Sequence, residues 1–368
     1  MSPHFRRRNT TSQLNIMVCG PSGVGKTSFI RSFCQTLCLA RGTSSVSSTN
    51  STTSSTTAST ATNPSASEHS IDATKLEHLM EWNEDPAPTV EFVATGYDIL
   101  EERERIHIRF IDTPGLVMDW RLEHQVVDLV RYVETQFDIT LAEETKIRRN
   151  PKAFDTQIHT CLYFIDPQNR GLTENDIRAI RWIGKRTNVM VVIAKSDTLT
   201  LSQANAIKRR VRADIQRLRL PVFKFHAEEA ELLYMASRKP GGAVGEQVPD
   251  VEHRRRDMED LDEDMDSELD EENRELQRLC PFTVFSAETG GMLGRQYPWG
   301  FISCLEPSHC DLSVLRSVLL SSHRQDLKLK TQRAYYERYR TERLLARKAS
   351  LGLSKEERQR LIENLASV

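Results

Sequence analysis

The sequence lacks any apolar run long enough to cross a lipid bilayer, which takes about 20 residues. Its apolar stretches, such as residues 189–194, are far shorter than that. The first residues include several arginines but no apolar core of the kind that a secretory signal peptide needs. We therefore expect a cytoplasmic protein rather than a secreted or membrane-spanning one.

Cysteine is scarce and scattered. Of the 7 cysteines, only Cys34 and Cys38 lie close together, and no second pair accompanies them. This spacing fits neither a disulfide framework nor a zinc site, so reduced thiols in the core are expected. The net charge of -2 is also small. It gives no electrostatic reason to expect a nucleic-acid partner.

Two segments have a composition that does not support a packed core. Residues 43–70 are almost entirely Ser, Thr and Ala, which bury too little surface to offset the entropy of ordering the chain. Residues 238–277 carry a dense acidic block, which favours an extended chain or a solvated helix. We interpret the first segment as a disordered insert and the second as an acidic surface insert.

Between these inserts, apolar strand-like runs alternate with amphipathic helix-like segments. The alternation predicts a mostly parallel sheet covered by helices on both faces, with ligands at the carboxyl ends of the strands. The expected fold class is therefore a three-layer α/β domain. The expected strands are 14–20, 105–112, 158–166, 189–197 and 281–287, and the expected helices are 28–37, 120–136, 173–185 and 201–218.

A glycine-rich turn follows the first expected strand and precedes the first expected helix. It reads GPSGVGKT, with the spacing of a phosphate-binding loop in the strand–helix context that such a loop needs. Glycines let the backbone N–H groups face the phosphates, Lys26 neutralises the β and γ charges, and Thr27 offers a hydroxyl to Mg²⁺. The predicted nucleotide-binding residues of this loop are Gly20, Pro21, Ser22, Gly23, Val24, Gly25, Lys26, Thr27 and Ser28.

The second expected strand ends in the sequence DTPG. Asp112 is placed to reach Mg²⁺ through water, and the amide of Gly115 is placed to face the γ-phosphate. DTPG alone is a common turn, but its place one strand after the phosphate loop favours a sensor of the terminal phosphate.

The sequence AKSD follows the expected strand 189–197 and predicts the choice of base. The Asp197 carboxylate can accept hydrogen bonds from the ring N–H and the exocyclic amine of guanine, whereas adenine offers neither donor there. The stem of Lys195 is expected to lie along the ring. Ser286 and Ala287 are expected to supply a backbone contact to the guanine oxygen. Together these residues predict GTP or GDP as the ligand.

Hydrolysis is expected to be slow, because Leu116 and Val117 stand after DTPG where a glutamine usually orients the attacking water. A threonine in the loop before the second expected strand is a candidate to bind Mg²⁺ or that water. Thr89 is the first choice and Thr95 the second, and either is compatible with an ordinary strand threonine. The predicted catalytic residues are Lys26 and Thr89, and the predicted metal site comprises Thr27, Thr89 and Asp112.

Beyond the nucleotide motifs come GRQYPWG at 294–300 and a long tract at 309–344 that ends in YRTERL. This region closely resembles the element that distinguishes septins from other P-loop GTPases. The likeness extends to APTVEF, IHTCLYFIDP and IAKSDTLT, and covers 14–345 apart from the two inserts. The resemblance divides the chain into a basic disordered N-terminus (1–13), a septin-type GTP-binding domain (14–300), a septin-unique helical extension (297–345) and a short tail with a helix (346–368).

The septin resemblance implies a GTPase domain that assembles with other septin-like subunits into hetero-oligomeric cytoskeletal filaments, at the cell cortex or division septum. It implies that the nucleotide supports assembly more than rapid turnover. By the same resemblance, Arg295 packs on guanine, and Trp299 and His159 reach a nucleotide-side interface. It also favours Thr89 over Thr95, since hydrolytic septins carry a threonine at the matching position.

The sequence departs from the septin pattern in several places. LVMD follows DTPG, which puts Asp119 one place late and casts doubt on how the second switch moves. A threonine stands at position 27, where septins more often have serine. Gly352 interrupts the chain before a short helix that begins at Ser354, so no long coiled coil is expected. With the Ser/Thr-rich insert, these features indicate a divergent member.

Two basic segments raise the question of further partners. Arg6, Arg7 and Arg8 precede the first expected strand, where septins commonly carry a patch for anionic phospholipids, and a solvated tail is the alternative. Residues 324–348 combine basic side chains with tyrosines, which is a pattern also found in RNA-binding segments. The helical spacing of the tyrosines favours a packing stripe, the septin resemblance favours contact with another subunit, and we expect no nucleic-acid partner.

Two other functions remain open from the sequence. A non-polymerising GTPase switch, or a translocon-type GTPase, would share the nucleotide motifs but is not expected to carry the tract at 309–344. A P-loop kinase has support from the first motif alone.

Overall fold

The computed structural model describes residues 12–42, 89–101, 104–148, 154–225, 271–288 and 292–350. The predicted insert 43–70, the arginines at 6–8 and the helix predicted after Ser354 lie outside these residues. Of the acidic insert predicted at 238–277, residues 271–277 are described and are helical. Leu276 in this helix is buried in the core, so the folded domain resumes before the predicted end of the insert.

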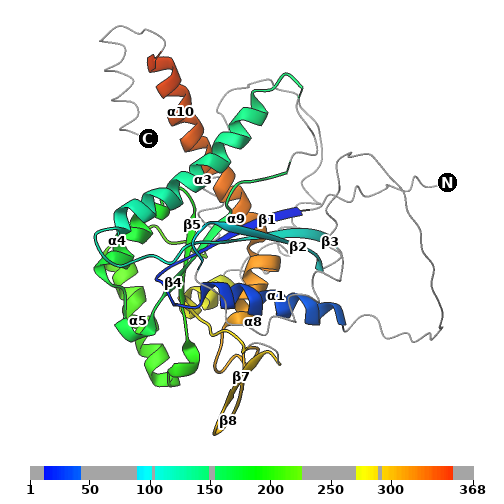
Figure 1. Cartoon of the computed structure of the whole chain (residues 1–368), viewed down its shortest axis with the longest axis vertical. Coiled ribbons are helices and arrows are strands. Elements are labelled where there is room, and N and C mark those ends of the chain that lie inside the picture. The colour runs from blue at the N-terminus through cyan, green and yellow to red at the C-terminus, as the bar shows by residue number, and fades with distance from the viewer. Residues whose placement is uncertain are drawn as a thin grey trace, which may run out of the picture.

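The core of the domain is a sheet of six strands in the order β2-β3-β1-β4-β5-β6 (Figure 1). β3, β1, β4, β5 and β6 run parallel, and β2 is antiparallel to β3 at one edge. The strand bounds are β1 Ser12–Cys19, β2 Val93–Glu101, β3 Glu104–Asp112, β4 Thr160–Ile165, β5 Asn188–Ile193 and β6 Phe282–Thr283. The predicted α/β fold with a mostly parallel sheet is confirmed, whereas β2 was not predicted.

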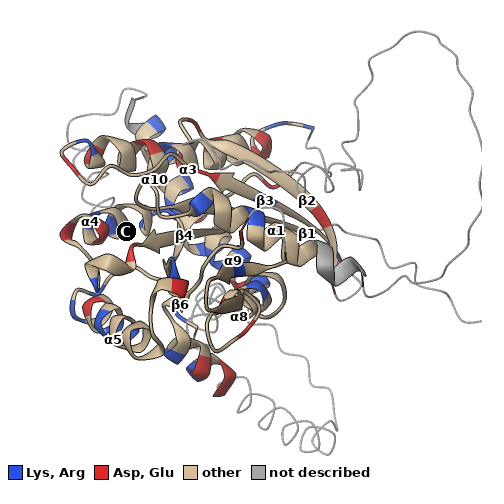
Figure 2. Ribbon diagram, turned by 60° about the horizontal axis from the view of Figure 1, so that its bottom comes forward, with Lys and Arg blue, Asp and Glu red and all other residues tan. Residues whose placement is uncertain are grey.

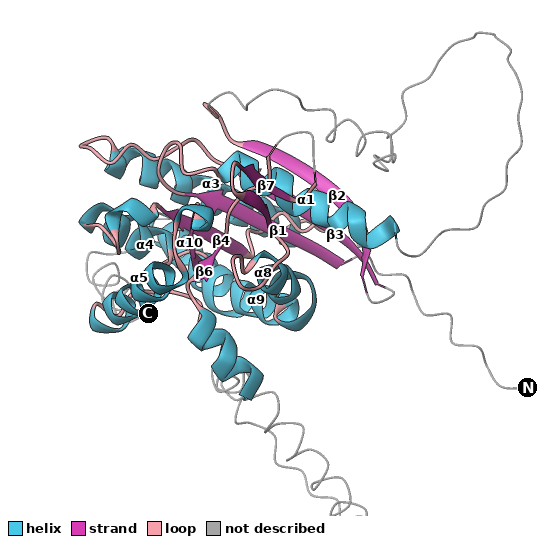
Figure 3. Cartoon of the chain, turned by 90° about the horizontal axis from the view of Figure 1, so that it is seen from below, coloured by secondary structure: helices cyan, strands magenta, loops and turns pink. Residues whose placement is uncertain are grey.

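Helices cover both faces of the sheet, because alternate strand residues point to opposite sides (Figure 3). Along β1, Leu14, Ile16 and Val18 belong to one apolar cluster, and Met17 and Cys19 belong to the other. The first cluster includes side chains of α1 (Lys26–Gly42), α8 (Leu312–Ser317) and α9 (Arg324–Lys330). The second includes side chains of α3 (Leu122–Glu144), α4 (Glu174–Ile183) and α5 (Leu201–Arg217).

The C-terminal part of the described chain is a run of helices that connects the two faces. Two π-helical segments, η3 (Val318–Ser322) and η4 (Thr331–Tyr336), join α8, α9 and α10 (Glu337–Ser350). Tyr336 and Tyr339 are 1% and 2% exposed, and both pack on Phe137 of α3. The centroid of the Phe137 ring lies 5.7 Å from that of Tyr336 and 5.5 Å from that of Tyr339. These two tyrosines therefore form a packing stripe within the chain, whereas contact with another subunit was expected.

Smaller elements complete the domain. The 3₁₀ turn η1 (Pro167–Asn169) follows β4, and η2 (Ser196–Thr198) follows β5. A hairpin of β7 (Gly294–Tyr297) and β8 (Gly300–Ser303) projects from the domain (Figure 1). Figure 2 shows acidic and basic residues together on the helices. In the described part of the chain, no helix combines the length and the apolar character needed to cross a membrane.

Candidate nucleotide-binding site

The phosphate loop joins β1 to α1 at the carboxyl end of the sheet, as the sequence predicts. Gly20, Gly23 and Gly25 have φ values of +143°, +72° and +96°, which favour glycine. A Cβ at Gly20 would lie 2.5 Å from the carbonyl oxygen of Phe164 in β4. The loop therefore curls tightly over the end of β4 and leaves the start of α1 open to a phosphate group.

Lys26 is the first residue of α1, and its ammonium group folds back over the loop. Nζ donates to the carbonyl oxygens of Gly20 at 3.1 Å and Pro21 at 3.0 Å. The side chain is buried, and this burial lowers the pKa of Lys26. Neutral carbonyls compensate a buried cation less well than anionic oxygens do, so the group is suited to receive the β- and γ-phosphates.

Thr27, Thr89 and Asp112 meet beside the loop. The Thr27 hydroxyl donates to Asp112 Oδ2 at 2.5 Å, Thr89 Oγ1 donates to the same oxygen at 3.1 Å, and the two hydroxyls are 3.2 Å apart. Asp112 Oδ1 is buried and has no hydrogen-bond partner among the described residues. Thr95 lies within β2, opposite Phe110, and does not join this group.

The donor chemistry of this group fits Mg²⁺. Two hydroxyls and a carboxylate are hard oxygen ligands, and Mg²⁺ usually takes only one or two protein ligands beside water and phosphate oxygens. No cluster of three or more His, Cys, Asp or Glu side chains that could hold a metal occurs among the described residues. A Mg²⁺ ion at this place would therefore depend on a bound nucleotide for the rest of its ligands.

The DTPG segment lies directly against the phosphate loop. A Cβ at Gly115 would be 2.6 Å from Cα of Ser22, so only glycine allows this approach. The amide of Leu116 donates to Gly20 O at 3.0 Å, and the amide of Ser22 donates to Leu116 O at 3.1 Å. The two segments form a short bridge, which holds Gly115 against Ser22 of the phosphate loop, and its role as a phosphate sensor stays a prediction.

A pocket for the base lies next to the loop, between the ends of β4, β5 and β6 and the β7–β8 hairpin. Its volume is about 330 Å³, part of which is open solvent. The predicted Val24, Gly25, Ser28, Lys195, Asp197, Ser286 and Arg295 line it, together with Phe164, Ala194, Val284 and Phe285. Residues that are distant in the sequence thus meet in one cavity.

Asp197 is the charged centre of this pocket, and its side chain is 0% exposed. Its Oδ2 accepts hydrogen bonds from Arg295 Nη1 at 2.9 Å and from the Tyr297 hydroxyl. Its Oδ1 is buried with no partner in the described part of the chain. A buried carboxylate oxygen without a donor is costly, so this oxygen is prepared for a ligand N–H group.

The loop after β6 is held by contacts on two sides. The Ser286 carbonyl oxygen accepts a hydrogen bond from Arg295 Nε at 2.9 Å. The Ala287 amide donates to Ser32 Oγ on α1 at 2.8 Å, so this amide is engaged within the chain rather than directed at the guanine oxygen. Ser32 positions the loop, and the sequence analysis did not identify it.

Known proteins are similar to this chain in sequence. The family model described as Septin matches residues 10–352. The chain belongs to the septin family. It is 32% identical over 351 residues to "Septation protein 7" of Candida albicans, which covers 90% of this septin and 48% of the relative. It is 30% identical over 351 residues to "Cell division control protein 11" of Saccharomyces cerevisiae, which covers 93% of this septin and 68% of the relative.

This septin thus spans about half the length of the first of these relatives. Among solved structures, the septin GTPase domain from Chlamydomonas reinhardtii is similar, with a TM-score of 0.53 and 20% sequence identity. The similarity covers 90% of this septin and 99% of that chain. At this identity the likeness concerns the fold, and it confirms the expected septin GTPase-domain architecture.

Trp299 lies at the tip of the β7–β8 hairpin of this septin and is 70% exposed. Its ring stacks on Tyr297, with centroids 4.9 Å apart and planes at 8°. Tyr297 in turn contacts Asp197 in the pocket. An exposed aromatic ring next to the base pocket is compatible with the predicted interface role of Trp299, which stays a prediction.

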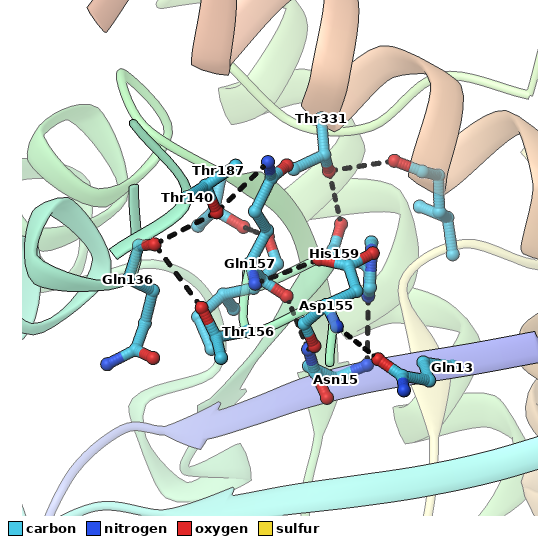
Figure 4. A network of polar contacts seen from close by, with 12 residues as sticks. Gln13, Asn15, Gln136, Thr140, Asp155, Thr156, Gln157, His159, Thr187 and Thr331 are labelled. Atoms are coloured by element: carbon cyan, nitrogen blue, oxygen red, sulfur yellow. Dashed lines mark hydrogen bonds and ion pairs between the residues drawn. The ribbon is translucent and has the colours of Figure 1, made fainter. Parts of the chain in front are cut away.

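His159 lies elsewhere. It precedes β4 at its amino end, and the pocket is at the carboxyl ends of the strands. His159 is 1% exposed; its Nδ1 accepts from the Asn15 amide at 2.9 Å, and its Nε2 lies 3.0 Å from Asp155 Oδ2 (Figure 4). The structure therefore gives His159 a role inside the domain and does not place it at the rim of the pocket.

Figure 4 also shows how the network around His159 reaches the C-terminal helices. The His159 carbonyl oxygen accepts from Thr331 Oγ1 at 3.2 Å. The same oxygen also accepts from Asn188 Nδ2 at 2.8 Å. Asn188 Nδ2 also donates to the Leu327 carbonyl oxygen at 3.1 Å. These contacts join the amino ends of β4 and β5 to the helical extension, far from the base pocket.

Proposed function

We propose that this septin-family chain binds GTP or GDP with Mg²⁺ and acts as a subunit of hetero-oligomeric filaments. The observation that carries the proposal is the buried Oδ1 of Asp197, which has no partner among the described residues and lies in a pocket next to a phosphate loop. Guanine presents two adjacent N–H donors to such a carboxylate, whereas adenine presents none there. The pocket therefore favours a guanine nucleotide.

The metal site of the proposal comprises Thr27, Thr89 and Asp112. A bound Mg²⁺ ion would neutralise charge on the β- and γ-phosphates. Thr27 and Thr89 offer hydroxyl oxygens, and Asp112 offers the oxygen that has no partner among the described residues. Hydrolysis is proposed to be slow, since Leu116 follows Gly115 and no glutamine is present there to orient water.

The nucleotide is proposed to support assembly. A ligand that binds only the folded pocket stabilises that pocket and the surface around it by mass action. Trp299 stands on that surface and is linked to the pocket through Tyr297 and Asp197. Partners are proposed to be other septin-like chains, in keeping with relatives named for septation and cell division control.

The site of action is proposed to be the cell cortex or division septum. Binding to anionic phospholipids through Arg6, Arg7 and Arg8 is part of this proposal and rests on their charge alone. Three basic residues give marginal binding, at about 1 kcal/mol each, unless a filament repeats them many times. Flotation of assembled protein with vesicles that contain phosphatidylserine tests this point, with the triple Arg→Ala variant as control.

The decisive experiment is isolation of the tagged full chain from its own cells in high salt. Co-purifying chains are identified by mass spectrometry with their stoichiometry, and bound nucleotide is identified by chromatography. Other chains with a phosphate loop and a YPWG-type tract in near-equal amounts, together with GDP or GTP, are expected. Recovery of the chain alone would favour a GTPase switch, and bound adenine nucleotide would refute the guanine assignment.

The interface part of the proposal has its own test. Trp299→Ala is expected to reduce the size of the purified oligomer while guanine nucleotide remains bound. Trp182→Ala is the matched control, because Trp182 is an exposed tryptophan on α4 and is 49% exposed. An unchanged oligomer with Trp299→Ala would remove this residue from the interface.

A further inference from the structure

The carboxylate of Asp197 is used unevenly. Oδ2 accepts two hydrogen bonds, from Arg295 Nη1 and from the Tyr297 hydroxyl, whereas Oδ1 accepts none among the described residues. Each carboxylate oxygen has about two acceptor sites. Oδ2 is therefore full and Oδ1 is empty. A ligand that donates to both oxygens must displace one of the two donors on Oδ2.

The two donors on Oδ2 are not held equally. Arg295 carries a charge opposite to that of Asp197, and its Nε also donates to the Ser286 carbonyl oxygen at 2.9 Å. The Tyr297 hydroxyl is a neutral donor; besides its hydrogen bond to Asp197, it interacts with the side chain of Arg295. Burial, together with the hydrogen bond to Asp197, raises the pKa of the Tyr297 phenol, so the hydroxyl remains a donor at neutral pH. Tyr297 is thus the donor that leaves more easily.

Tyr297 also has a second contact that carries its movement outward. Its ring lies nearly parallel to that of Trp299, at 8° and 4.9 Å between centroids. Trp299 is mostly exposed at the tip of the hairpin. Because the two rings are stacked, a shift of the phenol away from Asp197 changes the surroundings of the indole.

We propose that guanine displaces the Tyr297 hydroxyl from Asp197 and that Tyr297 thereby transmits occupancy of the base pocket to Trp299. This inference rests on the proposed guanine-nucleotide function. Tyr297 acts as a positioning residue in it, since it reports through another residue and does not read the base itself. Occupancy of the pocket is therefore not sufficient by itself. A base with two donors displaces the Tyr297 hydroxyl, and a base with one donor does not.

Inosine diphosphate supplies the comparison. Hypoxanthine keeps the ring N–H of guanine but lacks the exocyclic amine, so it donates one hydrogen bond where guanine donates two. The single donor is satisfied by the empty Oδ1, and the Tyr297 hydroxyl stays on Oδ2. GDP and inosine diphosphate therefore differ only in the group that competes with Tyr297.

The experiment uses the full chain after removal of bound nucleotide. Tryptophan emission is recorded during titration with GDP and with inosine diphosphate, and the signal of Trp299 is isolated by subtracting that of Trp299→Phe. Calorimetry gives the affinity for each nucleotide. We expect the Trp299 emission to shift on GDP saturation and to remain within a few per cent of its starting value on saturation with inosine diphosphate.

Tyr297→Phe removes the hydroxyl and keeps the stacking ring. GDP is expected to bind this variant about 3- to 10-fold more tightly, because it no longer has to break the hydrogen bond between the Tyr297 hydroxyl and Asp197. The affinity for inosine diphosphate is expected to change less than about 2-fold, because this nucleotide does not compete with the Tyr297 hydroxyl for Oδ2. The GDP-dependent shift of Trp299 emission should disappear. Tyr132→Phe is the control, since it removes a hydroxyl from another stacked pair, Phe92 and Tyr132.

Three results would overturn the inference. Equal Trp299 shifts with both nucleotides would show that the exocyclic amine does not matter. A full GDP-dependent shift in Tyr297→Phe would show that the hydroxyl does not matter. GDP binding without any Trp299 shift would separate the pocket from the indole and leave the proposed function standing. Failure of GDP to bind the parent chain would refute the proposed function as well.

Discussion

Thr89 donates a hydrogen bond to Asp112 over 3.1 Å, although the two residues belong to different segments on either side of the β2–β3 hairpin. The contact brings the segment before β2 to the same carboxylate oxygen that accepts from Thr27. A metal ion at this point would therefore contact the segment that precedes β2. Thr95, which is six positions further along the chain, points to no such group because it lies inside β2.

We expect Thr89→Ala to slow single-turnover hydrolysis of GTP by about 10-fold or more, because loss of a group that positions metal or water misaligns the attack. GDP affinity should change by less than about 2-fold, since the base and the α- and β-phosphates keep their contacts. The measurement is phosphate release from the full chain loaded with GTP. Thr89→Ser should restore part of the rate, and Thr95→Ala is the control. Equal rates for Thr89→Ala and the parent would remove Thr89 from the chemistry.

Lys26 predicts a pH dependence of stability in the nucleotide-free protein. Burial lowers its folded-state pKa below the value of 10.5 found in the unfolded chain. Between these two pKa values the unfolded state binds more protons than the folded state. The contribution of Lys26 to the free energy of unfolding therefore increases as pH rises. Below the folded-state pKa, Lys26 is charged in both states, and the full cost of burying the charged group lowers the free energy of unfolding.

Urea unfolding of the nucleotide-free chain at several pH values from neutral to alkaline checks this sign. The difference in unfolding free energy, parent minus Lys26→Met, should increase with pH. The same difference for Lys146→Met is the reference, because Lys146 is a surface lysine and its side chain is 59% exposed. A parent-minus-variant difference for Lys26 that is flat or falls with pH would contradict the prediction.

Asp197 predicts the choice of base. Asp197→Asn replaces one acceptor oxygen by an NH₂ donor, so guanine loses one hydrogen bond to a charged group and meets a donor in its place. GDP affinity should fall about 100-fold, and xanthosine diphosphate, which has a carbonyl where guanine has the amine, should bind more tightly than GDP. Competition with a fluorescent guanine nucleotide gives both affinities. Asp128→Asn on the exposed face of α3 is the control, and unchanged GDP affinity in Asp197→Asn would place the base elsewhere.

The parts of the site that the sequence predicts are those made by local patterns. The phosphate loop follows from glycine spacing after an apolar strand. Asp112 is the last residue of the apolar strand β3, and Asp197 lies in the short turn η2 that follows β5. Because such strands end at one edge, these side chains meet there without further information. The structure brings Thr27, Thr89 and Asp112 together as expected.

The missed features depend on packing between distant segments. β2 went unrecognised because its apolar residues do not match a simple alternation of buried and exposed positions: Val93 and Leu100 are exposed, whereas Tyr97 and Ile99 are buried. Ser32 on α1 is one small polar residue among apolar ones, and its bond to Ala287 spans 255 positions. No spacing rule in the sequence indicates such a contact.

Tyr297 and His159 both show that a sequence motif does not give the position of a side chain. The contact of Tyr297 was missed, and His159 was assigned to the wrong place. Tyr297 stands in the tract that identifies the family, yet its bond to Asp197 follows only from the fold of the hairpin. His159 was assigned by resemblance to the nucleotide-side interface, but β4 begins directly after it, at the end of the sheet away from the pocket. Residue type and motif therefore predict which chemistry is present, and strand direction decides where it lies.

Arg186 joins the C-terminal extension to the GTPase domain. Arg186 donates to Glu134 on α3 at 2.9 Å and to Glu342 on α10 at 2.6 Å, and its guanidinium lies 5.5 Å from the centre of the Tyr339 ring. The arginine side chain is only 17% exposed. Removal of the arginine would deprive both glutamates of this ion pair.

We expect Arg186→Ala to lower the free energy of unfolding by about 2 kcal/mol, less than for a fully buried ion pair because both glutamates keep some contact with water. Arg178→Ala is the matched control: Arg178 pairs with Glu174 on the exposed face of α4, and such a pair contributes about 0.5 kcal/mol. Urea unfolding of the full chain with saturating GDP provides both values. Equal losses for the two variants would show that Arg186 does not hold the extension, whereas a larger loss for Arg186→Ala that Glu342→Ala reproduces would locate the effect at the contact with α10.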